Sequence, residues 1–147
     1  MEQKKEVSGE AIARNLLEMS RLKVPVICII IGEGSSGGAL AIGVGDNIIM
    51  LENAVYSILS PEGFSSILWK DSTKAKEAAE IMKLTAEDLK KLGVIDKILK
   101  EPEGGAQNDL GHMAKTIKKE IVTSLNKLTQ IDKDELVEQR HKKFRKM

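Results

Sequence analysis

Apolar positions along the chain predict helices and strands in alternation. Ile12, Leu16 and Met19 recur at helical spacing, so we expect a helix here, which Pro25 ends. The next segment, residues 26–31, is a continuous apolar run rich in β-branched residues and bounded by proline and glycine. Strands covered on both faces of a parallel sheet have this pattern. We therefore predict a buried strand over this segment.

The rest of the chain continues the alternation. Further strands are predicted over 48–51, 55–59 and 94–99, and further helices over 61–70, 71–83, 110–128 and 134–146. Ser60 and Pro61 are typical of a helix start. Thr85 and Asp88 form a capping box for a short helix that ends at Gly93. The order of these elements predicts an α/β fold with a largely parallel sheet.

Composition narrows the class of protein. The 147 residues carry 23 basic and 22 acidic side chains, and this balance argues against a protein that mainly grips nucleic acid or an anionic membrane. Aromatic residues, the platforms for base stacking, make up only 3%. Cys28 is the single cysteine, which excludes an intramolecular disulfide and fits a reducing compartment. No apolar run is long enough to span a bilayer, so we expect a cytoplasmic protein that contacts neither membrane nor nucleic acid.

Positive charge gathers at the C-terminal end. No acidic residue follows Glu138, whereas five basic residues do: Arg140, Lys142, Lys143, Arg145 and Lys146. Cations near the end of a helix are favourably placed in the field of its dipole. We therefore expect a solvated helix end here, with a contact site for an acidic partner as the alternative.

A glycine-rich segment, residues 32–45, follows the first predicted strand and matches several motifs. Gly32, Gly34 and Gly37 spell the G-x-G-x-x-G pattern of dinucleotide-binding proteins, with Glu52 as the acidic residue further on. That motif needs a full helix between two strands, and glycines interrupt the segment after about two turns. A dinucleotide-binding, Rossmann-like module remains as an alternative.

Three other interpretations use the same glycines. Gly34, Ser36 and Gly38 spell G-x-S-x-G, which would make Ser36 a hydrolase nucleophile. That reaction needs a histidine, and His112 and His141 both fall on helices expected to be solvated. A tight packing turn without chemistry is a further alternative. The segment is also typical of an oxyanion hole, because glycines before an apolar helix leave backbone N–H groups open to a substrate.

Several segments of the sequence resemble the carboxyltransferase alpha subunits of bacterial-type acetyl-CoA carboxylase. The stretch GEGSSGGALAIGVG carries most of the resemblance, and SPEG, SILWK, AIARN, MSR, EP and GGA match in order along nearly the whole chain. The resemblance implies the crotonase fold, a spiral of ββα units with C-terminal helices. We expect residues 1–106 to form this core and 107–147 a helical extension.

The resemblance also implies a reaction, the transfer of a carboxyl group from carboxybiotin to acetyl-CoA to give malonyl-CoA in fatty acid biosynthesis. Enolate-like species on both reactants need fixed N–H donors more than a titrating side chain. By resemblance, Gly37 and Gly38 supply the oxyanion hole, with Ala39 N–H as a further donor, and Gly34 and Ser36 join them in binding carboxybiotin. The beta subunit would hold most of acetyl-CoA and any zinc, and no metal is expected in this chain.

The implied partners are the carboxyltransferase beta subunit, the biotin carboxyl carrier protein and biotin carboxylase, in an ATP-dependent complex. Two positions depart from the family pattern: Ser35-Ser36 stands for Gly-Ser, and Gln107 for His. Alpha subunits are usually about twice this length, so we expect a C-terminal portion, or one half of a split subunit, whose spiral is incomplete at its N-terminal side. The strand over 26–31 would then lie at a sheet edge and favour oligomers, and the isolated chain would be inactive. A non-catalytic assembly surface is the alternative.

Overall fold

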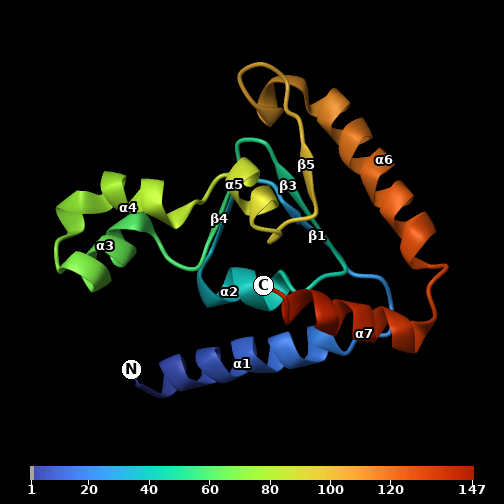
Figure 1. The fold of residues 1–147 in the computed structure, drawn as a ribbon, viewed down its shortest axis with the longest axis horizontal. Helices are drawn as coiled ribbons and strands as arrows, with labels where there is room; N and C mark the ends of the chain where they lie inside the picture. The colour runs from blue at the N-terminus through green and yellow to red at the C-terminus, as the bar shows by residue number, and fades with distance from the viewer. Residues whose placement is uncertain (1) are drawn as a thin grey trace.

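Two small parallel sheets form the centre of the molecule (Figure 1). The computed structural model describes residues 2–147, with side chains from residue 9 onward. The first sheet has the order β1 (Ile27–Ile30), β3 (Asn47–Leu51) and β5 (Lys97–Leu99). The second sheet pairs β2 (Glu33–Ser35) with β4 (Val55–Ser57). All of these pairings are parallel.

Seven helices surround the sheets in the described part of the chain. They are α1 (Glu2–Ser20), α2 (Ser36–Ile42), α3 (Pro61–Trp69), α4 (Ala75–Met82), α5 (Ala86–Lys91), α6 (Leu110–Leu128) and α7 (Lys133–Phe144), with short 3-10 turns at Ser72–Lys74 and Ala106–Asp109. In Figure 1, α3 and α4 lie together at one side, whereas α1 and α7 run side by side at the base. No helix of the described residues is both long and apolar enough to cross a membrane.

The elements repeat in ββα order. In β1–β2–α2 and again in β3–β4–α3, the first strand joins the first sheet and the second strand joins the second sheet. Because β1 pairs with β3 and β2 with β4, the second unit is stacked on the first in parallel register. This arrangement confirms the predicted spiral of ββα units, including the unit expected from the strands at 48–51 and 55–59.

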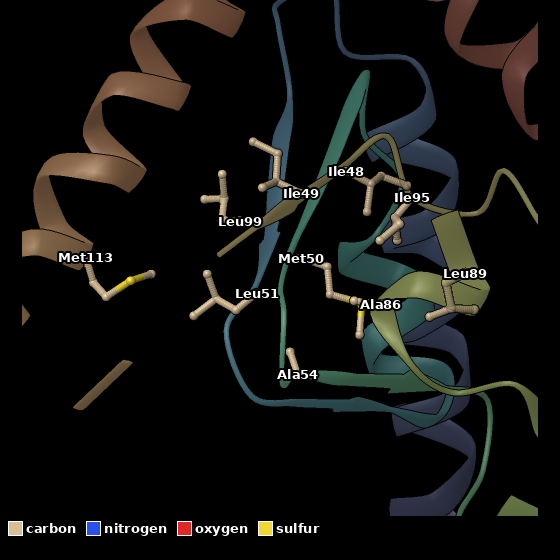
Figure 2. Packing of buried hydrophobic residues seen from close by; sticks show 10 residues of the cluster. All are labelled: Ile48, Ile49, Met50, Leu51, Ala54, Ala86, Leu89, Ile95, Leu99 and Met113. Carbon is tan, nitrogen blue, oxygen red and sulfur yellow. The ribbon is translucent and has the colours of Figure 1, made fainter. Parts of the chain in front are cut away.

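The hydrophobic core is built around β3, the central strand of the first sheet (Figure 2). Successive side chains of a strand point to opposite faces, so β3 is buried on both sides. Ile49 and Leu51 face Met113 of α6, whereas Met50 faces α5 with Ala86. The residues of β3 from Ile48 to Leu51 are at most 2% exposed. The strand β1 lies at the edge of its sheet, as predicted. Its four residues are only partly buried, so the expectation of a buried strand was wrong, because an edge strand has a neighbouring strand on one side only.

Three predicted elements differ from the structure. The strand expected over 94–99 covers only β5, because the N–H groups of Val94 and Ile95 donate to the carbonyl of Leu89 at the end of α5. The strand expected over 55–59 ends at Ser57, and the helix expected over 71–83 is divided into a 3-10 turn and α4. In addition, β2 was not predicted, because Glu33-Gly34-Ser35 has no apolar alternation and becomes a strand only through pairing with β4.

Candidate functional site

The glycine-rich segment forms a sharp turn from β2 into α2. The turn is made at Ser36, the first residue of α2, whose φ of 68° lies in the left-handed region. A left-handed backbone is rare for a residue with a Cβ atom and marks local strain. Gly37, Gly38 and Ala39 follow in the first turn of the helix. The structure therefore brings these predicted site residues together at one helix start.

Five of the six glycines of this segment fall into two groups, and the sixth, Gly32, lies before the helix with open space at its Cβ position. A Cβ atom on Gly34 would lie 2.8 Å from Tyr56 Cδ2, one on Gly43 2.3 Å from Tyr56 Oη, and one on Gly45 2.7 Å from a cysteine sulfur. Packing therefore requires glycine at these three positions. A Cβ atom on Gly38 would meet no atom within 4 Å, and one on Gly37 would make only an ordinary 3.6 Å contact. Neither of the last two needs a positive φ, so this chain alone gives no packing reason for them.

The start of α2 is also left without a side-chain cap. The first N–H groups of a helix have no partner within the helix and are commonly satisfied by a preceding Ser, Thr, Asp or Asn. The Ser35 side chain makes no such bond, and its Oγ lies 3.5 Å from Ser57 Oγ instead. Ser60 at α3, by contrast, caps its helix by accepting from Gly63 N–H. The N–H groups at the start of α2 are thus left available to an outside acceptor.

A cavity of about 360 Å³ lies beside this turn, between β1 and α2. Its walls are mainly apolar and include Ile31, Gly34, Ala39, Ile42 and Tyr56. Cys28 also lines the cavity and donates its thiol hydrogen to the Ile42 carbonyl, 3.1 Å away. Burial raises the pKa of the Cys28 thiol and of the Tyr56 phenol, so both groups are neutral at ordinary pH. The thiol and the phenol therefore add no charge to the cavity, and Glu33 is its one charged lining residue among the described side chains.

The hydrolase interpretation has the turn it requires but no base among the described side chains. Ser36 sits at a strained strand-to-helix turn, as a nucleophile serine would. His112, however, lies near Thr116 Oγ1 on the exposed face of α6. His141 Nε2 is 3.1 Å from the Ser20 carbonyl. His141 is half-buried, so the expectation that both histidines are solvated was wrong for this one.

The dinucleotide interpretation fails on the position of its glycines. Gly34, the second glycine of the pattern, lies inside β2 instead of in a turn between strand and helix. The helix that follows has only seven residues. Glu52, the acidic residue expected to bind a ribose, accepts hydrogen bonds from Lys100 Nζ and Glu101 N–H, and the Lys100 bond lowers the pKa of its carboxyl group.

One buried polar cluster was missed by the sequence analysis. Arg140, which was expected in a solvated helix end, is 1% exposed and pairs with Asp46. Lys143 is also half-buried and pairs with Asp96. The expectation was wrong because it counted only neighbours along the sequence, and Asp46 is 94 residues away. The one signal in the sequence was an aspartate within an otherwise apolar and glycine-rich segment.

Two parallel sheets linked in ββα order, with a glycine-rich turn beside an apolar cavity, are the arrangement of a crotonase-like fold. Residues 1–147 match the family described as acetyl co-enzyme A carboxylase carboxyltransferase-like. The chain belongs to this family.

Named relatives agree along most of the chain. An acetyl-coenzyme A carboxylase carboxyl transferase subunit alpha of Clostridium acetobutylicum is 57% identical over 139 residues, which are 95% of this chain and 51% of that protein. A protein of Clostridium tetani named as subunits beta/alpha is 60% identical over 137 residues, covering 93% of this chain and 24% of that protein. The chain thus spans about half the length of the alpha subunits it matches.

Solved structures agree on the fold. A chain of a Pseudomonas malonate decarboxylase hetero-tetramer in complex with coenzyme A superimposes with a TM-score of 0.64 at 17% identity, covering 90% of this chain and 52% of that chain. Transcarboxylase 12S, with methylmalonyl-coenzyme A and methylmalonic acid bound, gives a TM-score of 0.62 at 17% identity, covering 80% of this chain and 22% of that chain. Both likenesses support the crotonase-like fold predicted from the sequence.

Proposed function

We propose that this chain is part of a carboxyltransferase that moves a carboxyl group from carboxybiotin to acetyl-CoA, giving malonyl-CoA for fatty acid synthesis. Membership of the family supports the reaction class. The reaction is assigned to the start of α2 because of the two glycines there, Gly37 and Gly38. Glycine in a helix costs about 1 kcal/mol relative to alanine, and neither packing nor backbone conformation in this chain accounts for that cost here.

In this proposal, the N–H groups at the start of α2 act as an oxyanion hole. Carboxybiotin, when bound, supplies the carboxyl group that passes to the substrate. Gly37 and Gly38 donate backbone hydrogen bonds to an oxygen on which negative charge develops, and Ala39 N–H is a further donor. Open space at the Gly38 Cβ position lets an acceptor approach the backbone closely. Gly34 and Ser36 shape the turn that holds these donors in place, on the carboxybiotin side.

The proposed partners follow the same relatives. The Clostridium tetani relative carries beta and alpha in one name, which supports a beta-type subunit as the direct partner. A biotin carboxyl carrier protein and biotin carboxylase would supply carboxybiotin with the use of ATP, in the cytoplasm. Within the described residues, no cluster of three His, Cys, Asp or Glu side chains could hold a metal ion. We keep residues 1–106 as the core and 107–147 as the helical extension of this proposal.

The test replaces Gly38 by Val in a full-length alpha subunit that carries this sequence, assembled with a beta subunit. The side chain has room in this chain, so folding is retained while the approach to the N–H groups is blocked. Turnover should fall on the order of 10²-fold, the scale of losing one oxyanion donor. Gly9→Val is the matched control, because Gly9 is also exposed, helical and open at its Cβ position, and it should leave turnover unchanged. Equal turnover of the two variants would refute this site.

Ser36→Ala separates this mechanism from serine hydrolysis. In the proposed site Ser36 contributes its backbone turn and no nucleophile, so the variant should keep most of the malonyl-CoA formation. A loss as large as that of Gly38→Val would favour the hydrolase alternative.

A second candidate is an assembly surface without catalysis. The edge strand β1 and the exposed apolar side chains of Ile31 and Ile42, 63% and 69% exposed, favour association. Light scattering on this chain with and without a beta subunit tests association, and a carboxyltransferase assay on the full-length alpha subunit assembled with beta tests catalysis. An assembled complex without malonyl-CoA formation would favour this candidate over the proposed enzyme. A monomer that binds NAD would contradict both.

A further inference from the structure

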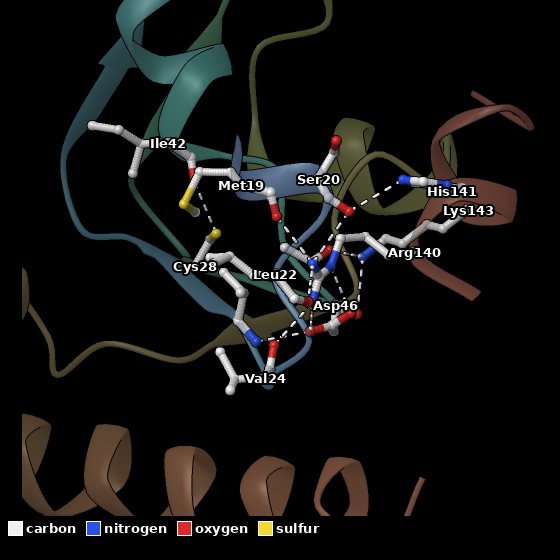
Figure 3. A network of polar contacts seen from close by, with 12 residues as sticks. Met19, Ser20, Leu22, Val24, Cys28, Ile42, Asp46, Arg140, His141 and Lys143 are labelled. Atoms are coloured by element: carbon white, nitrogen blue, oxygen red, sulfur yellow. Dashed lines mark hydrogen bonds and ion pairs between the residues drawn. The ribbon is translucent and has the colours of Figure 1, made fainter. Parts of the chain in front are cut away.

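The side chain of Arg140 is the best-satisfied buried charge in the described structure (Figure 3). This side chain is 0% exposed and lies between α7, the end of α1 and the loop before β3. Nε donates to Asp46 Oδ1 at 2.9 Å and Nη2 to Asp46 Oδ2 at 2.8 Å. This two-point contact uses the planar geometry by which arginine differs from lysine.

The remaining donors of Arg140 bind the end of α1 and the segment that follows it. Nη1 donates to the carbonyls of Met19 at 3.0 Å and Leu22 at 2.8 Å, and Nη2 donates to Val24 at 3.0 Å. The last carbonyls of a helix lack partners within the helix, and α1 has no basic residue in its last turn. Arg140 therefore caps α1 from a helix about 120 residues further along the chain, and all five of its N–H donors have an acceptor.

Asp46 extends this contact to the segment that follows α2. It lies in the connection from α2 to β3, and its Oδ2 accepts from Val26 N–H at 2.7 Å. The Asp46 N–H in turn donates to the Val26 carbonyl at 2.8 Å. The pair thus fixes the segment before β1 and the segment after α2 relative to each other.

The helix α2 lies between the two parts that Arg140 holds. At its start, Ile12 of α1 lies 3.6 Å from the Cβ position of Gly37. At its end, the Ile42 carbonyl accepts from Cys28 of β1, and the chain then reaches Asp46. A shift of α1 or of the α2–β3 connection would therefore move α2 and the N–H groups of its first turn.

We propose that Arg140 is a positioning residue for the Gly37–Gly38 backbone: by fixing α1 and the α2–β3 connection, it sets the direction of those N–H groups. The inference rests on the proposed function of the glycine pair. It gives the C-terminal helix α7 a role in the reaction, although α7 itself contributes no group to the oxyanion hole.

The test compares Arg140→Ala and Arg140→Lys with Arg145→Ala, all in the full-length alpha subunit assembled with beta. Arg145 lies on the same helix end but is exposed, so its variant should behave as wild type. Both Arg140 variants should lower kcat per folded complex on the order of 10²-fold, the scale of a 1 Å misplacement, with the KM for acetyl-CoA changed less than about twofold. Arg140→Lys keeps a cation in the site and carries the test if the alanine variant does not fold.

Two further measurements distinguish positioning from a general loss of structure. Added methylguanidinium should restore part of kcat in Arg140→Ala but none in Gly38→Val, whose donors are blocked directly. Hydrogen exchange should become faster over residues 36–42 in Arg140→Lys, while β3 keeps its protection. The inference is overturned if Arg140→Lys keeps wild-type kcat and exchange in α2, or if its lost activity only follows the fraction of unfolded protein. Failure of the proposed function would give a different result. Either Gly38→Val would keep wild-type turnover, or the wild-type complex would form no malonyl-CoA.

Discussion

The aromatic ring of Tyr56 lies against the backbone of Gly34, because the two residues pair in register between β4 and β2. A Cβ atom on Gly34 would be 2.8 Å from Tyr56 Cδ2, closer than such atoms approach. The Tyr56 hydroxyl also lies over Gly43 and is 3.4 Å from the Ala39 carbonyl. One tyrosine therefore explains two glycines of the segment by packing alone.

This relationship predicts that Gly34→Ala destabilises the protein whereas Gly38→Ala does not. The added methyl group on Gly34 forces the tyrosine ring or the strand to move, which should lower the free energy of unfolding by about 1–3 kcal/mol. Gly38→Ala meets open space in a helix and should leave stability unchanged or slightly higher. Urea unfolding of both variants checks the difference. Equal stability of the two would contradict the packing assigned to Tyr56.

The left-handed backbone of Ser36 predicts a stabilising substitution. A residue with a Cβ atom costs roughly 1–2 kcal/mol in this conformation, and the greater freedom of unfolded glycine offsets about half of the gain from its removal. Ser36→Gly should therefore raise the free energy of unfolding by up to about 1 kcal/mol. Thermal unfolding of both variants checks this prediction. Ser36→Ala is the control, because it retains the backbone strain and should show no gain in the free energy of unfolding.

Cys28 predicts a pH-dependent reactivity in the cavity beside β1. Burial raises the pKa of its thiol above the ordinary value of 9.0, so the thiolate forms later in the folded protein than in the unfolded chain. Alkylation by iodoacetamide should therefore be slow at pH 8 and reach half of its maximum rate above pH 9. In urea the same profile should move down to the ordinary pKa. A folded-state midpoint below that of the unfolded chain would contradict the burial of this thiol.

The raised pKa of Cys28 also predicts how the stability of the protein changes with pH. Because the folded pKa of Cys28 is raised, its contribution is fully present below the unfolded pKa and is lost as the pH rises through the folded pKa. The difference in unfolding free energy between wild type and Cys28→Ala should thus be constant below pH 8 and should shrink above pH 9.

Much of this fold follows from local patterns. The apolar runs at 26–31 and 48–51 predicted the strands β1 and β3. Only β3 is buried on both faces, because β1 has a neighbouring strand on one side only. Thr85 and Asp88 predicted the start of α5, where Thr85 Oγ1 accepts from Asp88 N–H at 3.2 Å. The short strand β2 could not be predicted in this way, because only its pairing with β4 makes it a strand.

The residues of the candidate site also differ in whether a local sequence pattern could predict them. Gly37 and Gly38 were predicted as site residues because glycines next to an apolar helix are a local signal, and the structure places both at the start of α2. The contact between Arg140 and Asp46 was not, since it joins residues 94 positions apart and depends on the path of α6 and α7. A single sequence shows charges along the chain, but it does not show which of them the fold brings together.

The last prediction concerns that contact. A buried charge that loses its partner is destabilised far more than an exposed one, so Asp46→Ala and Arg140→Met should each lower the free energy of unfolding by about 3–5 kcal/mol. The double variant removes both charges and should lose clearly less than the sum of the two. It should not regain wild-type stability, because the carbonyls of Met19 and Leu22 lose the donors that Arg140 gives them.

The matched control is the exposed pair of Lys23 and Asp134, which joins the same α1–β1 segment to the same helix α7. Lys23→Ala should leave stability unchanged, because solvent already screens this pair. Urea unfolding of the four members of the cycle gives the coupling energy between Arg140 and Asp46 directly. Additive losses in the double variant would show that the two side chains act independently and would contradict the paired geometry.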